Sequence, residues 1–245
     1  MTRVLGLVPA RAGSKGVPDK NVKPLAGASL IEYAARAGRE SGVLDRIVLS
    51  TDSAAIADAG RQAGLEVPFL RPADLAADET PMLAVIRHAL ASLDSSGWHA
   101  DMLVLLQPTS PLRTARHVRD AVRMLHDPGA DSVVTVVKVP RHLSPDYVMR
   151  IEQGVLRPFL PDGARITRRQ DARAAYAREG TVYACWRRTI ETFGDIYGAD
   201  CRPLLLDPAE SLSIDSPADW DEAERRLSGE RRARAGSAAV GNESR

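Results

Sequence analysis

The sequence predicts an α/β fold in which a mostly parallel sheet carries helices on both faces. Short continuous apolar runs alternate with segments whose apolar residues recur at helical spacing. The strand-like runs are unbroken rather than alternating, as is typical of parallel strands that are buried on both faces. With 245 residues, 44% of them hydrophobic, the chain has enough apolar material for one large domain.

The first half of the chain is expected to supply most of the sheet. We expect buried strands at residues 4–9, 47–50 and 102–106, and a shorter strand at 67–70. Helices are expected from Leu30, after a Ser53 cap, and after Thr80 as cap with Pro81 as the first helical residue. In such a sheet ligands bind beyond the carboxyl ends of the strands. Functional residues are therefore expected just after Val8, Leu49 and Leu106.

The second half begins with one more helix and strand and then changes character. The expected elements are a helix at 115–125, strands at 132–137, 181–186 and 203–206, and a closing helix at 217–227. Between them, residues 140–180 contain proline, arginine and short alternating runs at 147–151 and 155–159, which indicate an inserted lid or dimerisation segment of strands and loops. We expect one domain over residues 1–227 and a disordered tail over 228–245.

Charge and composition exclude several classes of protein. The chain has 33 basic and 32 acidic residues, so no net field attracts it to nucleic acid or to an anionic membrane. It contains no apolar stretch of membrane-spanning length and no secretory leader, which predicts a cytoplasmic protein. Cys185 and Cys201 are too few for a disulfide framework, and neither they nor the five histidines have metal-ligand spacing.

The loop after the first expected strand has the composition of a phosphate-binding segment. Only four residues of the chain are lysine, against 29 arginines, and Lys15, Lys20 and Lys23 fall within nine positions. Two glycines allow close backbone approach, the Ser14 hydroxyl and the backbone amides can bind oxygen anions, and Arg11, Lys15 and Lys20 supply charge for a triphosphate. The spacing matches neither the P-loop nor the dinucleotide-binding glycine motif. The alternative is a solvated loop in an arginine-rich chain.

Six blocks of sequence carry a family resemblance. They lie at residues 11–31, 49–52, 70–76, 105–113, 168–171 (followed by Gly180 and Tyr183) and 214–220. In content, order and spacing they resemble the acylneuraminate cytidylyltransferases and, more loosely, the octulosonate cytidylyltransferases, over roughly residues 3–227. The resemblance implies a Rossmann-like nucleotidyltransferase that transfers CMP from CTP to the anomeric hydroxyl of a keto sugar acid and releases pyrophosphate. The acceptor would be sialic acid or a related nonulosonic acid.

The resemblance also assigns roles to individual residues. Nucleotide contacts fall on Arg11, Asn21, Arg71 and Thr80, and the chemistry of the loop adds Ser14 and Lys15. Catalytic roles fall on Lys20 beside the phosphates, on Arg169 at the transferred group and on Gln107, which with Gln170 faces the acceptor. Asp215 matches a magnesium-binding carboxylate, and Mg²⁺ suits a reaction that must neutralise phosphate charge. A homodimer is expected, with no nucleic-acid or membrane partner.

Simpler structural interpretations compete with some of these roles. Asp215 precedes a helix and could be its N-cap, and Gln107 could satisfy backbone groups in its own loop. Arg71 could be a surface residue. Arg113 and Thr114 could simply open the helix that follows them.

The chain departs from the family pattern at three places. Many members carry an aspartate at the position of Ser213, an asparagine at that of Glu179 and a proline at that of Arg173. The first change leaves Asp215 as the remaining carboxylate of the pair, and the other two lie where the acceptor is expected, so the sugar acid need not be ordinary sialic acid. Two rival functions stay open: a nucleotidyltransferase for an octulosonate or another pair of nucleotide and sugar, and a non-catalytic nucleotide-binding regulator.

Overall fold

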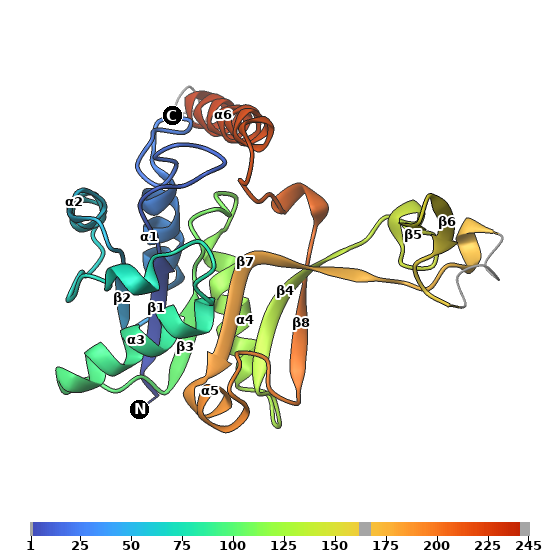
Figure 1. Ribbon diagram of the computed structural model, residues 1–245. Helices are drawn as coiled ribbons and strands as arrows, with labels where there is room; N and C mark the ends of the chain where they lie inside the picture. The colour runs from blue at the N-terminus through green and yellow to red at the C-terminus, as the bar shows by residue number, and fades with distance from the viewer. Residues whose placement is uncertain (1, 162–167, 241–245) are drawn as a thin grey trace.

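The computed structural model describes residues 2–161 and 168–240 and has a six-stranded sheet at its centre (Figure 1). In spatial order the strands are β2 (Arg46–Ser50), β1 (Val4–Pro9), β3 (Met102–Leu105), β7 (Tyr176–Trp186), β4 (Ser132–Lys138) and β8 (Cys201–Leu206). Neighbours are parallel except that β7 runs antiparallel to both β3 and β4. The predicted Rossmann-like α/β fold with a mostly parallel sheet is confirmed.

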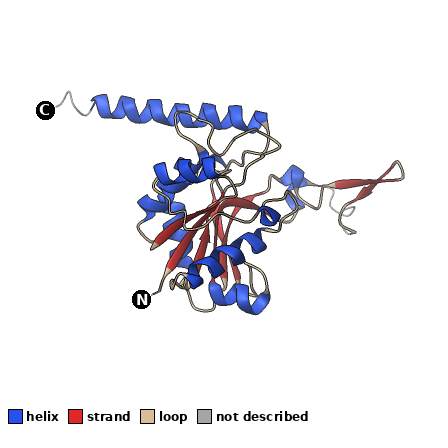
Figure 2. Ribbon diagram, turned by 60° about the vertical axis from the view of Figure 1, so that its left-hand side comes forward, coloured by secondary structure: helices blue, strands red, loops and turns tan. Residues whose placement is uncertain are grey.

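Helices cover both faces of this sheet, as Figure 2 shows. They are α1 (Leu30–Ser41), α2 (Ala54–Gln62), α3 (Met82–Ser95), α4 (Ala115–Leu125), α5 (Arg187–Phe193) and α6 (Pro217–Val240). Alternate residues of β1 point to opposite faces: Val4 and Val8 join the core shared with α1 and α4, whereas Leu5 and Leu7 join the core shared with α3 and α5. Each such buried side chain contributes about 1.5–3 kcal/mol. No helix in the described part of the chain is both long enough and apolar enough to cross a bilayer.

A third apolar cluster fixes the loop that follows β1. Val17 and Leu25 of this loop are buried together with Trp220 and Leu227 of α6. The carboxyl-terminal helix therefore packs on the amino-terminal loop, and Figure 1 shows the two side by side above the sheet. This contact holds a long glycine-containing segment that has no regular structure of its own.

Some local predictions differ from the structure. Thr80 is not a helix cap: α3 begins at Met82 after Pro81, whose backbone is extended, with ψ of 136°. The strand expected at 67–70 is absent, because the chain makes a single bridge to β2 at Glu66 and then leaves the sheet. The helix expected to end at Leu227 continues to Val240, so residues 228–240 are helical where a disordered tail was expected; they are rich in the helix formers arginine and alanine. Residues 241–245 lie outside the described part.

The insertion between β4 and β7 forms an arm that projects from the sheet (Figure 1). The two strands stay paired up to Lys138 and Tyr176, and the arm beyond them carries a hairpin of β5 (Met149–Glu152) and β6 (Val155–Pro158). At the base of the hairpin, Asp146 accepts hydrogen bonds from the backbone N and Nε of Arg173 at 2.7 and 2.9 Å. The chain reverses direction through this arm, which is why β7 returns antiparallel.

Candidate active site

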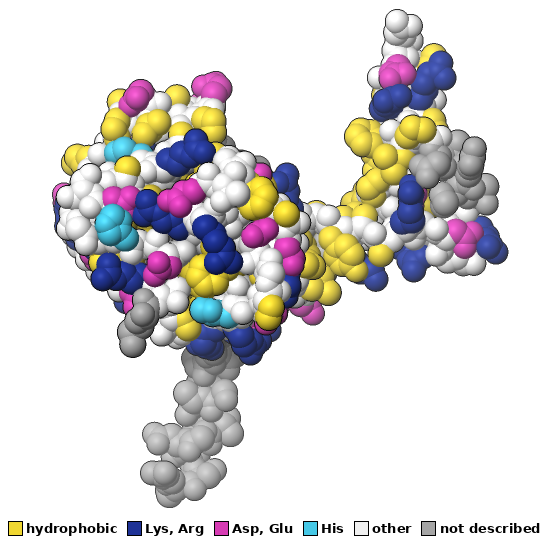
Figure 3. All heavy atoms as spheres, turned by 90° about the horizontal axis from the view of Figure 1, so that it is seen from below, with side chains coloured by type: hydrophobic (Ala, Val, Ile, Leu, Met, Phe, Trp, Pro, Cys, Tyr) yellow, Lys and Arg dark blue, Asp and Glu magenta, His cyan; other side chains and the backbone are white. Residues whose placement is uncertain are grey.

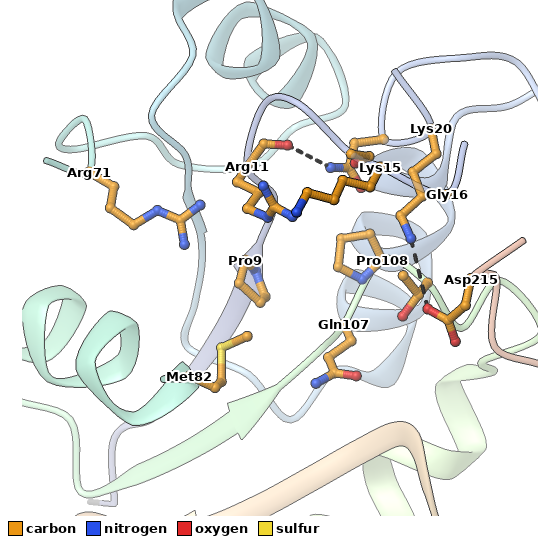
Figure 4. Close-up of a pocket in the computed structure, with 13 residues that line it drawn as sticks. Pro9, Arg11, Lys15, Gly16, Lys20, Arg71, Met82, Gln107, Pro108 and Asp215 are labelled. Atoms are coloured by element: carbon orange, nitrogen blue, oxygen red, sulfur yellow. Dashed lines mark hydrogen bonds and ion pairs between the residues drawn. The ribbon is translucent and has the colours of Figure 1, made fainter. Parts of the chain in front are cut away.

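A cavity of about 410 Å³ opens at the carboxyl ends of β1 and β3 (Figure 4). This is the edge at which ligands bind in sheets of this kind. Eight of the residues singled out from the sequence line it: Arg11, Ser14, Lys15, Lys20, Asn21, Arg71, Gln107 and Asp215. The cavity therefore gathers positive charge from the β1 loop around the amide of Gln107.

The β1 loop is held in shape by contacts from two other segments and by one hydrogen bond within the loop. Gly16 lies so close to the segment before α6 that a Cβ on it would stand 1.9 Å from the carbonyl oxygen of Asp215. The Asn21 side chain donates to the carbonyl oxygen of Arg11 at 3.1 Å, and Asp52, at the end of β2, accepts from the backbone N of Ala12 at 3.0 Å. Asn21 therefore stabilises the loop through a hydrogen bond to the loop's own backbone. Only glycine permits the close approach at position 16.

Lys20 points from the β1 loop toward the segment before α6. Its Nζ donates to the carbonyl oxygen of Ile214 at 2.8 Å and lies 4.0 Å from Oδ1 of Asp215 (Figure 4). Burial lowers the pKa of Lys20, the nearby carboxylate of Asp215 raises it, and the positive charge of Arg11 lowers it again. The ammonium group is thus fixed at the wall of the cavity beside one carboxylate.

Asp215 is not the cap of α6. Ser216 and Asp219 form that cap: Oγ of Ser216 accepts from the backbone N of Asp219 at 3.3 Å, while Oδ2 of Asp219 accepts from the backbone N of Ser216 at 2.8 Å. The Asp215 side chain is 75% exposed at the cavity and accepts a hydrogen bond from the Ser213 hydroxyl at 3.0 Å. Its carboxylate is therefore free for ligand chemistry, and the capping interpretation is wrong.

Arg71 is buried, with only 5% of its surface exposed, so the surface interpretation is also wrong. Its Nη2 lies 3.8 Å from Oδ1 of Asp52, and neither Nη2 nor Nε has a hydrogen-bond partner among the described residues. Burial lowers its pKa, and Asp52 opposes that effect. A buried guanidinium with unused donors at a cavity wall is suited to bind the acceptor atoms of a ligand.

Gln107, two residues after the end of β3, lies against a bulge in β7. The pairing of β4 with β7 shifts between Val134 and Val136, and the Thr135 hydroxyl pins the bulge by donating to the carbonyl oxygen of Glu179 at 2.7 Å. The bulge brings Gly180 so close that a Cβ there would stand 2.6 Å from Oε1 of Gln107. The absence of a side chain at Gly180 thus leaves room for the Gln107 amide.

Arg113 holds the backbone at Gln107 against β7. Its guanidinium donates to the carbonyl oxygens of Gln107 and Thr181, and burial lowers its pKa to about 10 while Glu179 opposes the shift. Oε2 of Glu179 accepts from the backbone N of Thr181 at 2.7 Å. Thr114 caps α4, so the simpler interpretation is confirmed for this residue. Arg113 does not open the helix but is buried and connects the turn after β3 to β7. The sequence signalled this residue only through its place in the block at residues 105–113.

Two of the described residues expected at the site, Thr80 and Gln170, do not line the cavity. Thr80 lies on the loop before α3, where its hydroxyl donates to the carbonyl oxygen of Asp74 at 3.4 Å. Gln170 is exposed on the arm, in a short 3-10 helix spanning Arg169–Asp171. Arg169 belongs to the same helix, and its side chain lies outside the described residues. Sequence reasoning also missed Asp52 and Asp78, which contact the β1 loop from other segments.

Comparisons with known proteins agree with this geometry. The family model described as cytidylyltransferase matches residues 5–225. The chain is 36% identical over 226 residues to the CMP-N,N'-diacetyllegionaminic acid synthase of Legionella pneumophila, covering 91% of this chain and 95% of that protein. It is 31% identical over 228 residues to the N-acylneuraminate cytidylyltransferase A of Danio rerio and 27% identical over 224 residues to the N-acylneuraminate cytidylyltransferase of Escherichia coli. These matches cover 91% of this chain and about half of each of those two longer proteins.

Solved structures show the same fold. A CMP:2-keto-3-deoxy-manno-octonic acid synthetase complexed with CTP superposes with a TM-score of 0.70 at 14% identity, covering 94% of this chain and all of the other. The 4-diphosphocytidyl-2C-methyl-D-erythritol synthase of Anaerococcus prevotii superposes with a TM-score of 0.62, also at 14% identity, covering 92% of this chain and 98% of the other.

Proposed function

The chain belongs to the cytidylyltransferase family, and on that premise we propose that it transfers CMP from CTP to the anomeric hydroxyl of a nonulosonic acid, releasing pyrophosphate. The observation that carries the proposal is the cavity in which Arg11, Lys15 and Lys20 lie beside the Gln107 amide at one edge of the sheet. Three cations suit a triphosphate, and the amide suits a sugar acid beside it.

The phosphates would lie along the β1 loop. Attack of a hydroxyl on the α-phosphorus requires in-line placement and neutralisation of the charge that develops on the leaving pyrophosphate. Lys20 and Arg11 supply fixed positive charge, and the backbone at Gly13 and Gly16 allows close approach. No covalent intermediate is needed, because the acceptor hydroxyl is itself the nucleophile.

The cytidine would lie toward Arg71. Arg71 lines the cavity, and its Nε and Nη2 donors have no partner among the described residues, so its guanidinium is suited to bind acceptor atoms of the pyrimidine or of the ribose. Thr80 stands on the adjoining loop, and we propose that it joins these contacts when the nucleotide is bound.

Magnesium fits the donor set at Asp215. Hard Mg²⁺ needs only one or two protein carboxylates when phosphate and water oxygens supply the remaining ligands. Asp215 offers one exposed carboxylate beside the phosphate loop, with the Ser213 hydroxyl next to it, and the described residues contain no cluster of three or more acidic, histidine or cysteine ligands. When bound there, the metal would neutralise phosphate charge. The carboxylate of Asp215 would hold the metal, and the ammonium group of Lys20 would bind the phosphates beside it.

The acceptor would lie between Gln107 and the arm. Gln107 faces the bulge at Gly180, while Gln170 lies in the short 3-10 helix Arg169–Asp171 on the arm and does not line the cavity. Figure 1 shows the arm projecting from the sheet. The roles proposed for Gln170 and Arg169 require the assembly or a closure of the arm to bring them to a cavity. The similarity to the Legionella synthase supports an acceptor of the legionaminic type.

We further propose that the protein is a cytoplasmic homodimer whose interface is built on the arm. Figure 3 shows apolar side chains along the projecting segment. Ile151 is 76% exposed, Leu156 is 62% exposed and Phe159 is 54% exposed, although all three are large apolar residues. An isolated hairpin is marginal in water, so a second copy that covers these side chains would stabilise it.

Pyrophosphate release tests the proposal directly. The protein is incubated with Mg²⁺, CTP and a panel of keto sugar acids that includes N-acetylneuraminic, N,N'-diacetyllegionaminic and octulosonic acids, with ATP and GTP in parallel. We expect release with CTP and a nonulosonic acid, together with a CMP-sugar of matching mass. Release with the octulosonate alone would favour the rival acceptor, and no release with any pair would favour a nucleotide-binding regulator.

A further inference from the structure

Asp78, on the loop before α3, is paired with two of the cations that the proposed function assigns to phosphate. Its carboxylate contacts Nη2 of Arg11 through one oxygen and Nζ of Lys15 through the other. The hydrogen bond from Lys15 and the charge of Arg11 lower the pKa of Asp78 against the opposing effect of burial. The carboxylate is therefore ionised at neutral pH.

Without this carboxylate the β1 loop would hold several positive charges close together. The effect of Arg11 on the pKa of Lys20 shows that these charges repel one another. The other hydrogen bonds of the Arg11 guanidinium are long ones, at 3.5 and 3.4 Å to the carbonyl oxygens of Ala12 and Gly13. Asp78 is thus the strongest partner of Arg11 in this state, and it presents two anionic oxygens as a phosphate group would.

The position of Asp78 makes simultaneous binding of carboxylate and phosphate unfavourable. Lys15 lines the cavity with 78% of its side chain exposed, and Arg11 lines it as well. A triphosphate in the cavity would use the same donors and would place like charge beside the carboxylate. The ammonium of Lys15 and the guanidinium of Arg11 must therefore exchange one anionic partner for the other.

We propose that Asp78 is a tethered competitor for the phosphate site: it holds Arg11 and Lys15 in the empty enzyme, is displaced by the triphosphate, and regains them as pyrophosphate leaves. This inference rests on the proposed function. It predicts that Asp78 weakens the binding of every ligand that carries a phosphate chain and leaves the binding of the nucleoside unaffected.

The contact also connects two loops that are distant in the sequence. Arg11 and Asp78 are 67 residues apart, and the loop of Asp78 continues into α3, whose Met82 lines the same cavity. Displacement of Asp78 would release this segment when the nucleotide arrives. Re-formation of the pair would favour departure of pyrophosphate, since the carboxylate replaces the lost anion.

The chain offers a matched control in the next residue. Glu79 is an exposed carboxylate on the same loop and makes no ion pair within the described residues. Asp78→Asn and Glu79→Gln remove the same charge from the same loop, but only the first removes the contact with Arg11 and Lys15. Titration calorimetry at fixed ionic strength then compares the binding of CTP, pyrophosphate and cytidine to the wild type and the two variants.

We expect Asp78→Asn to bind CTP and pyrophosphate about fivefold more tightly and cytidine unchanged, while Glu79→Gln shifts each by less than about twofold. In turnover, pyrophosphate should inhibit Asp78→Asn at correspondingly lower concentration. Unchanged CTP binding by Asp78→Asn would overturn the inference, because Asp78 would then not compete with the phosphates. Weaker CTP binding would also overturn it, because Asp78 would then position Arg11 for the nucleotide. Equal tightening in both variants would overturn it as a general charge effect. A wild type that binds pyrophosphate but never turns over CTP would contradict the proposed function, and the pyrophosphate comparison would still decide for or against Asp78.

Discussion

The cavity edge and the arm differ in how their side chains are supported. At the cavity, Lys20 and Arg113 each have partners from other segments, and both are largely buried. On the arm, the large apolar residues Ile151 and Leu156 are exposed, and in the described part of the chain the two strands that carry them pair only with each other. One chain therefore brings together most of the residues proposed to bind the nucleotide. The acceptor half, with Gln170 and Arg169 on the arm, depends on what the arm contacts.

The largest expected effect separates these two regions. Ile151 and Leu156 are paired across the hairpin, so the double variant Ile151→Asp/Leu156→Asp places two charges on the proposed interface. We expect a monomer by light scattering and loss of nearly all CMP-sugar formation, with CTP affinity within about twofold of the wild type. Arg157→Ala, which changes an exposed residue of the same hairpin, is the control and should leave the dimer and the rate of CMP-sugar formation unchanged. A dimeric, active double variant would show that the arm is not the interface.

A second change attacks the cavity instead of the arm. Lys20→Ala should reduce kcat/KM for CTP by about 10- to 100-fold, because a charge-assisted phosphate contact contributes on the order of 1.5–3 kcal/mol. Lys23→Ala is the matched control, since Lys23 lies over the Trp220 ring, 4.8 Å from its centroid, and does not line the cavity. Steady-state kinetics with thermal unfolding would check both. Near-normal CTP use by Lys20→Ala would remove the phosphate-loop assignment.

A third change examines the boundary between the two halves. Gly180→Ala places a methyl group 2.6 Å from Oε1 of Gln107, so the amide must move. We expect about a tenfold loss of kcat/KM for the acceptor, since displaced positioning groups are costly, and little change in KM for CTP. Equal losses for both substrates would instead indicate that the bulge supports the whole cavity.

A fourth set of changes separates the ligand role of Asp215 from the capping of α6, and its effect on stability is the smallest expected here. Ser216→Ala should lower the free energy of unfolding by about 1 kcal/mol with little change in rate, since it removes a cap. Asp215→Asn should leave stability unchanged and remove most of the Mg²⁺-dependent rate, whereas Ser213→Asp should not harm it. Chemical denaturation and rate measurements over a range of Mg²⁺ concentrations check the set. An Asp215→Asn protein with normal magnesium dependence would contradict the metal assignment.

Sequence reasoning located the cavity but not its supports. The apolar runs at β1 and β3 were predictable, and the carboxyl ends of neighbouring parallel strands lie at one edge, so Lys20 and Gln107 could be expected together. Asp78 and Arg113 could not be assigned, because their contacts with Arg11 and Thr181 span 67 and 68 residues and depend on how the loops pack. The direction of β7 was equally hidden, since it follows from the path of the chain through the arm.

The central claim is that the cavity of one chain recognises CTP and supplies its CMP for transfer, and the ratio of kcat/KM for CTP to that for UTP tests it most directly. UTP has the same triphosphate, so the phosphate loop treats the two alike, and any difference arises at the base. A site that hydrogen-bonds the cytosine edge leaves buried groups unpaired when the 4-amino donor becomes a carbonyl acceptor, and we expect a preference for CTP of at least about 100-fold. Comparable values for the two nucleotides would contradict the account and favour a nucleotidyltransferase that acts on another nucleotide and sugar.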